Sequence, residues 1–206
     1  MNLLEVQGLR KTYPAFRLED VSFSVPEGAV MGLIGRNGAG KSTTLKSILG
    51  LVHPDAGRVE MFGREFSENE RYIKENIGVV LGGIDFYPKK KVRTITDVTR
   101  RFYSNWQEEK YRHYLDLFAI DENKRVDQLS SGMRVKYLLA LALSHNARLL
   151  ILDEPTSGLD PVSRDELTEL LRRIAADGTR SVLFSTHITS DLEKCASHIT
   201  FIQEGR

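Results

Sequence analysis

Short apolar segments alternate with amphipathic segments along most of this chain. The apolar run 29–34 is followed by a glycine-rich stretch and then by residues 41–51, whose leucine and isoleucine side chains fall on one helical face. The same alternation of apolar and amphipathic segments returns after Gln128. Because strands that alternate with helices are joined by right-handed crossovers, this pattern predicts an α/β fold with a mainly parallel sheet.

The second half of the chain gives the clearest expectations. Its predicted helices and strands, in chain order, are helix 132–144, strand 149–152, helix 161–176, strand 181–185, short helix 190–195 and strand 199–202. The helix at Pro161 has the strongest boundary signals: Asp160 can cap its first turn, proline is favoured at the first helical position, and Gly178 follows its end.

The beginning and the middle of the chain differ from the second half in composition and in their predicted elements. Short strands are expected at residues 3–6, 21–25, 58–62 and 77–81. Residues 83–126 are rich in charged and aromatic side chains, and residues 100–120 are predicted to form one helix. This middle section is therefore expected to be an inserted helical subdomain.

Composition limits the possible functions. The 206 residues carry 29 Lys and Arg against 28 Asp and Glu, a net charge of +1, which excludes a general polyanion-binding surface, and no nucleic acid partner is expected. The one cysteine, Cys195, allows neither an internal disulfide nor a cysteine-based metal cluster. The longest apolar run, residues 137–143, is far shorter than the ~20 residues that span a bilayer. We expect a cytoplasmic protein that reaches a membrane only by docking to a spanning partner.

The glycine-rich stretch matches a phosphate-binding motif. Residues 35–42 follow the pattern G-x-x-x-x-G-K-[ST] between a predicted strand and a predicted helix, and the alternative is a turn with incidental glycines. In such a loop, successive backbone N–H groups converge on a phosphate at the helix N-terminus. Lys41 is expected to reach the β- and γ-phosphates, and the Ser42 hydroxyl to ligate Mg²⁺. The candidate phosphate ligands are Gly35, Asn37, Gly38, Ala39, Gly40, Lys41, Ser42 and Thr43.

Two carboxylates follow the buried strand 149–152. Asp153 is expected to hold Mg²⁺ through water, and Glu154 to act as the general base for an attacking water, because ligands bind at the carboxyl ends of parallel strands. A turn or helix cap is the alternative for this pair. His187 follows the next predicted strand and is a candidate sensor of the γ-phosphate, although a lone histidine is more often a surface residue.

Taken together, these motifs resemble the ATP-binding-cassette (ABC) ATPase family. The matching segments are Walker A at 35–42, the signature at 129–133, Walker B at 149–154, the D-loop at 157–160 and the switch His187. The resemblance implies a P-loop NTPase (RecA-like) core with an N-terminal antiparallel β subdomain and an inserted α-helical subdomain. Residues 1–206 would form one such domain, with the β subdomain at about 1–28 and 57–82, the helical subdomain at about 83–134, and the nucleotide-binding core at 29–56 and 135–206.

The resemblance also implies roles for residues that the motifs alone do not explain. Tyr13 would stack on the adenine of ATP, for which a strand-edge tyrosine is the alternative. ABC domains work as head-to-tail pairs, so Ser130 and Gly132 would contact the γ-phosphate held by a second ABC ATPase subunit, identical or different. Asp160 would cross the same interface. Ser130 or Ser131 is in any case a suitable N-cap for the helix that follows.

This chain departs from the family pattern in two places. Gly82 stands where the family has a glutamine that touches Mg²⁺ and water, and Asp85 or a water is a candidate substitute. The signature has Ser131 and Met133 where glycine and glutamine are usual. Such variants look like those of drug, peptide and antibiotic efflux ATPases that pair with separate membrane subunits.

The function implied is that of an ATP-hydrolysing transporter subunit, with ATP and Mg²⁺, bound to a transmembrane permease on the inner face of the cell membrane, in an exporter. Two alternatives stay open: an ABC ATPase that moves no substrate, and a regulatory module that dimerises on nucleotide without turnover. The basic run 89–93 is expected to be a solvated loop, or else a contact with the permease or acidic lipid. The aromatic residues 102–118 are expected to form the helical core, with a minority lining a groove for a permease helix.

Overall fold

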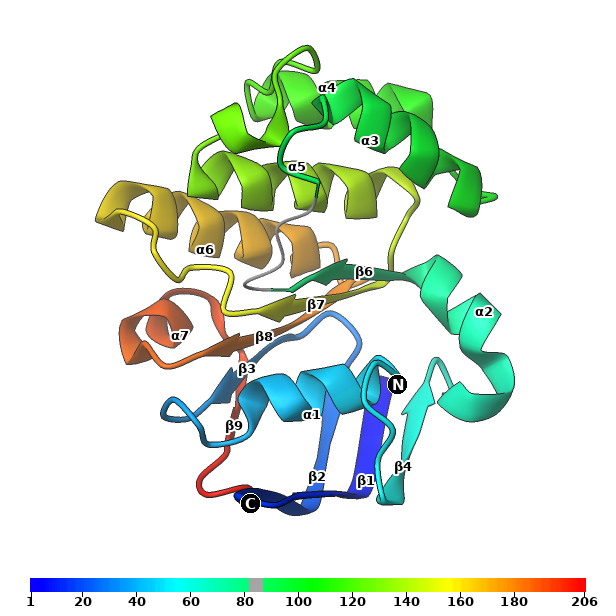
Figure 1. Ribbon diagram of the computed structural model, residues 1–206, viewed down its shortest axis with the longest axis vertical. Helices are drawn as coiled ribbons and strands as arrows, with labels where there is room; N and C mark the ends of the chain where they lie inside the picture. Colours follow the sequence, from blue (N-terminus) through cyan, green and yellow to red (C-terminus); the bar gives the residue numbers. More distant parts are fainter. Residues whose placement is uncertain (82–86) are drawn as a thin grey trace.

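Two β-sheets of different construction run through the structure, a computed structural model that describes residues 1–81 and 87–206 (Figure 1). The first sheet is antiparallel, with strand order β2-β1-β4-β5. Its strands are β1 (Asn2–Tyr13), β2 (Phe16–Pro26), β4 (Ala56–Met61) and β5 (Arg64–Glu65). The short strands expected at 3–6 and 21–25 pair with each other at the open end of one long hairpin, whose apolar positions face the core.

The second sheet is parallel, with strand order β6-β7-β8-β3-β9. Its strands are β3 (Val30–Ile34), β6 (Ile77–Val80), β7 (Leu149–Asp153), β8 (Ser181–Thr186) and β9 (His198–Phe201). Strands β7 and β8 are buried along their whole length, which explains their nearly continuous apolar sequences. The mainly parallel sheet predicted from the sequence is confirmed.

Helices cover both faces of the parallel sheet. They are α1 (Lys41–Ile48), α2 (Phe66–Asn76), α3 (Val92–Thr99), α4 (Glu108–Leu117), α5 (Ser131–Ser144), α6 (Pro161–Ala175) and α7 (Thr189–Cys195), with 3₁₀ turns at Arg100–Phe102 and Val126–Gln128. Helix α1 lies between the two sheets, α5 and α6 cover the opposite face of the parallel sheet, and α3 and α4 lie beyond α5 (Figure 1). One apolar core therefore lies on the α1 side and another under α5 and α6.

The single helix expected over residues 100–120 is wrong. The chain forms a 3₁₀ turn at Arg100–Phe102, leaves the helical conformation, and resumes as α4 at Glu108. Tyr103 is extended, and its ring stacks on His145 at the end of α5 with the centroids 3.7 Å apart. The Gln107 N–H donates to the Ser144 carbonyl at 2.8 Å. These contacts with α5 hold the intervening residues out of a helix.

Two further differences concern the middle of the chain. Strand β6 was expected in the antiparallel part, within 57–82, but it pairs with β7 in the parallel sheet. This position depends on Gly78, because a Cβ there would lie 2.4 Å from the Ala142 Cβ of α5. Helices α2 and α3 were not predicted; α3 is composed mainly of β-branched residues, which have low helix propensity. Its first residues, Val92 and Arg93, belong to the basic run expected to be a loop.

A buried polar cluster ties α3 to α4 and α5. The Thr96 Oγ1 lies 2.7 Å from the Tyr111 hydroxyl and 2.9 Å from the Tyr137 hydroxyl, and burial raises the pKa of both tyrosines. Tyr111 and Phe118 are core residues, as expected, whereas Phe102 is 72% exposed. The helical part therefore has its own core, which packs on α5.

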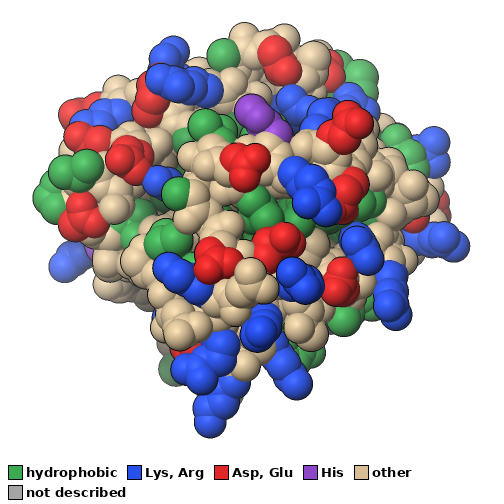
Figure 2. Space-filling model, turned by 90° about the horizontal axis from the view of Figure 1, so that it is seen from above, with side chains coloured by type: hydrophobic (Ala, Val, Ile, Leu, Met, Phe, Trp, Pro, Cys, Tyr) green, Lys and Arg blue, Asp and Glu red, His purple; other side chains and the backbone are tan. Residues whose placement is uncertain are grey.

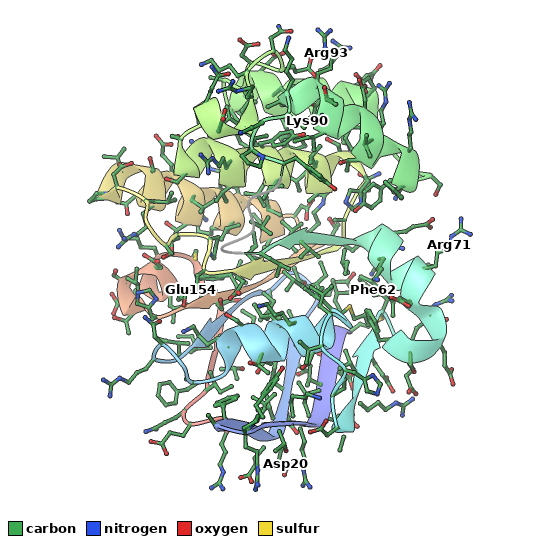
Figure 3. The ribbon with its side chains drawn as sticks, viewed as in Figure 1. Asp20, Phe62, Arg71, Lys90, Arg93 and Glu154 are labelled. Atoms are coloured by element: carbon green, nitrogen blue, oxygen red, sulfur yellow. The ribbon has the colours of Figure 1, made fainter. Side chains whose placement is uncertain are left out.

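The outer face of this helical part carries charges of both signs. Figure 2, which looks down on this end of the molecule, shows acidic and basic side chains interspersed. Lys90 and Arg93 are exposed and lie at the end remote from the antiparallel sheet (Figure 3). Among the described residues, no helix combines the length and the apolar character that crossing a membrane requires. Gly82 and Asp85, the two positions considered for the missing glutamine, lie outside the described residues.

Candidate functional site

The loop between β3 and α1 is built on glycines that no other residue could replace without strain. Gly40 is the N-cap of α1 and has a φ of 113°, and Gly38 has a φ of 81°. A Cβ on Gly35 would lie 2.3 Å from the Ile202 carbonyl oxygen, so the loop approaches the end of the chain too closely for any side chain. Around Gly38 a Cβ would meet nothing within 4 Å, which leaves the loop open on that side. The backbone is thus shaped for a group that docks at the N-terminus of α1.

Lys41, the first residue of α1, places a buried amine inside this loop. Its side chain is 4% exposed, and its Nζ donates to the carbonyl oxygens of Gly35 at 2.8 Å and Arg36 at 3.3 Å. The same Nζ lies 3.1 Å from the Glu154 Oε1. A buried ammonium needs such partners, because burying an unpaired charge is costly. The amine is therefore held where phosphate oxygens at the loop would meet it.

Asp153 collects two hydroxyl groups at the end of β7. Ser42 donates to its Oδ1 at 3.1 Å, and Ser185 donates to the same oxygen at 2.6 Å. Hydroxyl and carboxylate oxygens are the ligands that Mg²⁺ takes in proteins, so this donor set fits that ion. Ser42 and Asp153 would hold the ion between the loop and the strand end.

Ser185 was missed by the sequence analysis. It is the β8 partner of Asp153 in the parallel register, and its Oγ also accepts the Glu154 N–H at 2.9 Å. Strand β8 also contains Ser181 and Thr186, so Ser185 does not stand out as a polar position in the sequence. Ser185 thus fixes both the Asp153 carboxylate and the backbone of Glu154.

Glu154 stands between two candidate catalytic groups. Its Oε1 faces Lys41, and its Oε2 lies 3.0 Å from the Nδ1 of His187, which follows β8. Glu154 has a φ of 48°, which is unusual for a residue with a side chain, and the Ser157 N–H closes a turn on its carbonyl at 3.1 Å. Such backbone strain is found most often at active sites. The turn brings the carboxylate back over the α1 loop, where it can accept a proton from a bound water.

A second group of candidate residues lies at the N-termini of α5 and α6. Ser130 caps α5 by accepting the Met133 N–H at 3.2 Å. Asp160 caps α6 by accepting the N–H groups of Val162 at 3.1 Å and Ser163 at 3.0 Å. The hydrogen bonds from Ser163 hold the pKa of Asp160 below its ordinary value. Both caps agree with the sequence analysis.

These two helix ends are neighbours of each other but not of the loop site. A Cβ on Gly132 would lie 3.6 Å from the Ser163 Cβ and 3.7 Å from the Leu159 Cδ2, which puts the start of α5 against the start of α6. Within residues 1–81 and 87–206, neither Ser130 nor Asp160 bonds to the loop before α1 or to Glu154. Helices α1 and α5 lie on opposite sides of the parallel sheet (Figure 1). One chain thus presents two separate surfaces of candidate residues.

Phe16 is the aromatic residue that lines the pocket at the loop, and the adenine contact expected for Tyr13 stays a prediction. Tyr13, at the end of β1, is 39% exposed, and its ring centroid is 5.8 Å from the Lys11 Nζ. Phe16 instead lines a pocket of about 420 Å³, with the loop glycines, Ser42 and Thr43. A Cβ on Gly40 would lie 2.9 Å from the Phe16 Cζ. An aromatic ring therefore borders the loop, contributed by Phe16, the cross-strand partner of Tyr13 in the hairpin.

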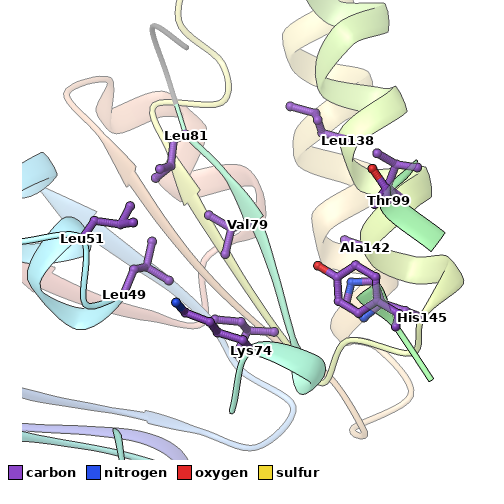
Figure 4. A pocket seen from close by; sticks show the side chains of 12 residues that line it. Leu49, Leu51, Lys74, Val79, Leu81, Thr99, Leu138, Ala142 and His145 are labelled. Carbon is purple, nitrogen blue, oxygen red and sulfur yellow. The ribbon is translucent and has the colours of Figure 1, made fainter. Parts of the chain in front are cut away.

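An apolar cavity of about 400 Å³ separates the helical part from the parallel sheet (Figure 4). Leu51 and Val79 line it from the sheet side, and Leu138 and His145 from α5. Leu51 is 58% exposed, so the cavity opens to the surface. Burial lowers the pKa of His145 to about 4, and its ring is therefore neutral at physiological pH. This is an apolar recess suited to an apolar segment of a partner.

Comparison with known proteins identifies the family of these motifs. The family model for ABC transporters matches residues 18–157. The chain is 32% identical to the bacitracin transport ATP-binding protein BcrA of Bacillus licheniformis, over 99% of this chain and 68% of that protein. It is 39% identical to the Nod factor export ATP-binding protein I of Burkholderia orbicola (strain AU 1054), over 90% of this chain and 62% of that protein. The chain thus spans about two thirds of the length of these relatives.

A solved structure of the ATP-binding subunit of an ABC transporter has the same fold. It is 29% identical in sequence, with a TM-score of 0.86, and the match covers 99% of this chain and 87% of that one. The similarity includes both sheets and the helical part, because nearly the whole chain is matched.

Proposed function

This chain belongs to the ABC transporter family of ATP-binding proteins, and from that premise we propose that it hydrolyses ATP in order to move a substrate through a separate membrane permease. The observation that carries the proposal is the Lys41–Glu154–His187 arrangement, in which one carboxylate reaches both a buried amine and an imidazole at about hydrogen-bond distance. Phosphoryl transfer to water needs a group that binds the phosphates and a group that activates the water. The amine in the glycine loop suits the first role, and the carboxylate and histidine at neighbouring strand ends suit the second.

Each residue has a separate task in this proposal. Lys41 and the backbone N–H groups of the loop bind the phosphates. Glu154 accepts the proton of the attacking water, and His187, which contacts Glu154 through its Nδ1, orients that water and the terminal phosphate. Ser42 and Asp153 would hold Mg²⁺, which would neutralise phosphate charge. Before nucleotide arrives, Glu154 neutralises the amine that the phosphates will later contact.

We further propose that two subunits pair head to tail around ATP. The second surface supports this pairing: Ser130 and Gly132 lie with Asp160 at two adjacent helix N-termini, which favour anions. That surface lies apart from the loop site of its own chain. A partner's loop site would therefore complete it, and breaking the pair after hydrolysis would give a two-state switch.

The permease is proposed to dock at the apolar cavity beside α5. The cavity is open at Leu51 and lies where the helical part meets the sheet that carries Asp153 and Glu154. A partner segment bound there would contact both the helical part and the parallel sheet, so a movement of one relative to the other would reach the partner. The protein would then lie on the inner face of the cell membrane, held there by the permease.

Export is the proposed direction of transport. It rests on the two relatives, of which one is a bacitracin transport protein and the other a Nod factor export protein.

The test is phosphate release from ATP by the purified protein, together with its mass in light scattering. We expect Mg²⁺-dependent release by the wild type, and a dimer of the Glu154→Gln protein that forms only with ATP. ATP-dependent dimerisation of the wild type without any release would favour the regulatory module instead. Absence of ATP binding would overturn the proposal.

A further inference from the structure

A buried carboxylate on α7 links the segments that carry Glu154 and His187. Asp191 is fully buried, and its Oδ2 accepts a hydrogen bond of 2.6 Å from the hydroxyl of Thr156. Thr156 is itself 1% exposed and lies two residues after Glu154. Asp191 lies four residues after His187, at the start of the helix that follows the histidine. One buried bond therefore joins the two catalytic segments.

The other oxygen of Asp191 faces a third segment. Its Oδ1 lies 3.9 Å from the Nε of Arg164, on the first turns of α6, and neither atom has a hydrogen-bond partner among the described residues. The Arg164 guanidinium also reaches the Leu159 carbonyl, at 3.5 Å, in the loop before Asp160. The Asp191 carboxylate thus lies among the catalytic loop, the start of α6 and the His187 segment.

Burying the Asp191 carboxylate between these three segments costs desolvation free energy. Apolar side chains of similar volume would often stabilise such a site as well or better. A hydrogen bond, unlike apolar contact, fixes direction and distance, and that is useful where a second contact between the same segments must keep its geometry. That second contact is the 3.0 Å approach of the Glu154 Oε2 to the His187 Nδ1, which is partly open to solvent.

We propose that Asp191 is a positioning residue for hydrolysis. Through the Thr156 hydroxyl it holds the turn after Glu154 against the helix after His187, and so keeps the carboxylate and the imidazole in register. The inference rests on the proposed roles of Glu154 and His187. It concerns only the relative placement of these two groups, because in residues 1–81 and 87–206 no hydrogen bond or ion pair joins Asp191 to the phosphate-binding loop or to Lys41.

The first test separates turnover from nucleotide binding. Thr156→Val removes the hydroxyl at nearly constant shape and should lower kcat about tenfold or more, because a misplacement of about 1 Å is enough for such losses. The KM for ATP should stay within about twofold, because the phosphate loop is untouched. Thr156→Ser keeps the hydroxyl and should restore kcat to within about twofold of the wild type. Thr156→Ala serves if valine does not fit.

A matched control is Thr168→Val. Thr168 is also 1% exposed, and its hydroxyl donates to the Asp165 carbonyl of its own helix, so kcat should not change. Wild-type kcat in both Thr156→Val and Thr156→Ala would overturn the proposal. So would an equal loss in Thr156→Ser, because the hydroxyl would then not be the cause.

The second test needs no turnover. In nucleotide-free protein, amide hydrogen exchange at residues 154–159 should be at least about tenfold faster in Thr156→Val than in the wild type, while exchange in α4 stays unchanged. Equal exchange at residues 154–159 in the two proteins would overturn the proposal that the Thr156–Asp191 hydrogen bond holds this turn. If the wild type itself released no phosphate, the proposed function would fail. The amide exchange at residues 154–159 would still test whether the Thr156–Asp191 hydrogen bond holds this segment in place.

Discussion

Replacing Glu154 with glutamine removes one negative charge from beside a buried amine and leaves the side-chain shape unchanged. In nucleotide-free protein, Lys41 keeps its two carbonyl partners but loses the carboxylate at 3.1 Å. Breaking a fully buried pair from one side costs about 3–5 kcal/mol. Glu154 is 23% exposed, and water can compensate in part, so we expect a loss of about 1–2 kcal/mol. For a domain of this size the melting temperature should fall by about 2–8 °C.

ATP should reverse this loss, because its phosphates supply the anion that Lys41 has lost. The rise in melting temperature caused by ATP should therefore be larger in Glu154→Gln than in the wild type by the same margin. Phosphate release should fall by about 10²–10⁴-fold, since the general base is gone. Calorimetry with and without ATP, and a phosphate assay, measure the two effects.

The matched control is Glu193→Gln, an exposed glutamate on α7, which should leave the melting temperature and phosphate release unchanged. The reasoning fails if Glu154→Gln melts like the wild type without nucleotide and gains no more from ATP. It also fails if that variant releases phosphate at the wild-type rate.

Three further predictions concern binding and pH. Lys41→Ala should abolish ATP binding in calorimetric titration, whereas Lys46→Ala, exposed on the same helix, should bind as the wild type does. Burial lowers the pKa of His145 to about 4, so the unfolded chain, with a pKa near 6.5, takes up the proton first as the pH falls. The free energy of unfolding therefore keeps the full contribution of neutral His145 above pH 6.5 and decreases by about 2–3 kcal/mol towards pH 4. In denaturant titrations at several pH values, His145→Gln should reduce this dependence of the unfolding free energy on pH. Tyr13→Ala should weaken ATP binding about tenfold without affecting inorganic triphosphate, and the same selective loss in Phe16→Ala alone would assign the adenine contact to Phe16.

The local sequence was enough to predict those parts of the site that depend on strand ends and turns. Gly35 and Gly40 are required by the path of the backbone, and Asp153 ends a strand that is buried on both faces. The spacing of the glycines and the acids at the end of an apolar run are both visible in the sequence, so these features could be predicted without the structure. The caps Ser130 and Asp160 were predictable for the same reason, because a cap bonds to residues two or three positions away.

Features that depend on contacts between distant residues were not predictable in this way. Ser185 acts through its register with Asp153, and a serine on a buried strand carries no local sign of that partner. Residues 103–107 leave the helix because Tyr103 stacks on His145, a contact across 42 positions of sequence. Phe16 borders the phosphate loop because the β1–β2 hairpin places it there, which no local pattern in the sequence indicates. Tertiary contact decides each of these cases.

The most direct test of the central claim is affinity capture with the Glu154→Gln protein and ATP from detergent-solubilised membranes of the organism that makes it, followed by mass spectrometry. The account predicts a polytopic membrane protein, captured by this protein but not by one that also carries Leu51→Glu at the open apolar cavity. Leu117→Glu, on the equally exposed surface of α4, should leave capture intact. Ribosomal or DNA-associated partners without any membrane protein would contradict the account.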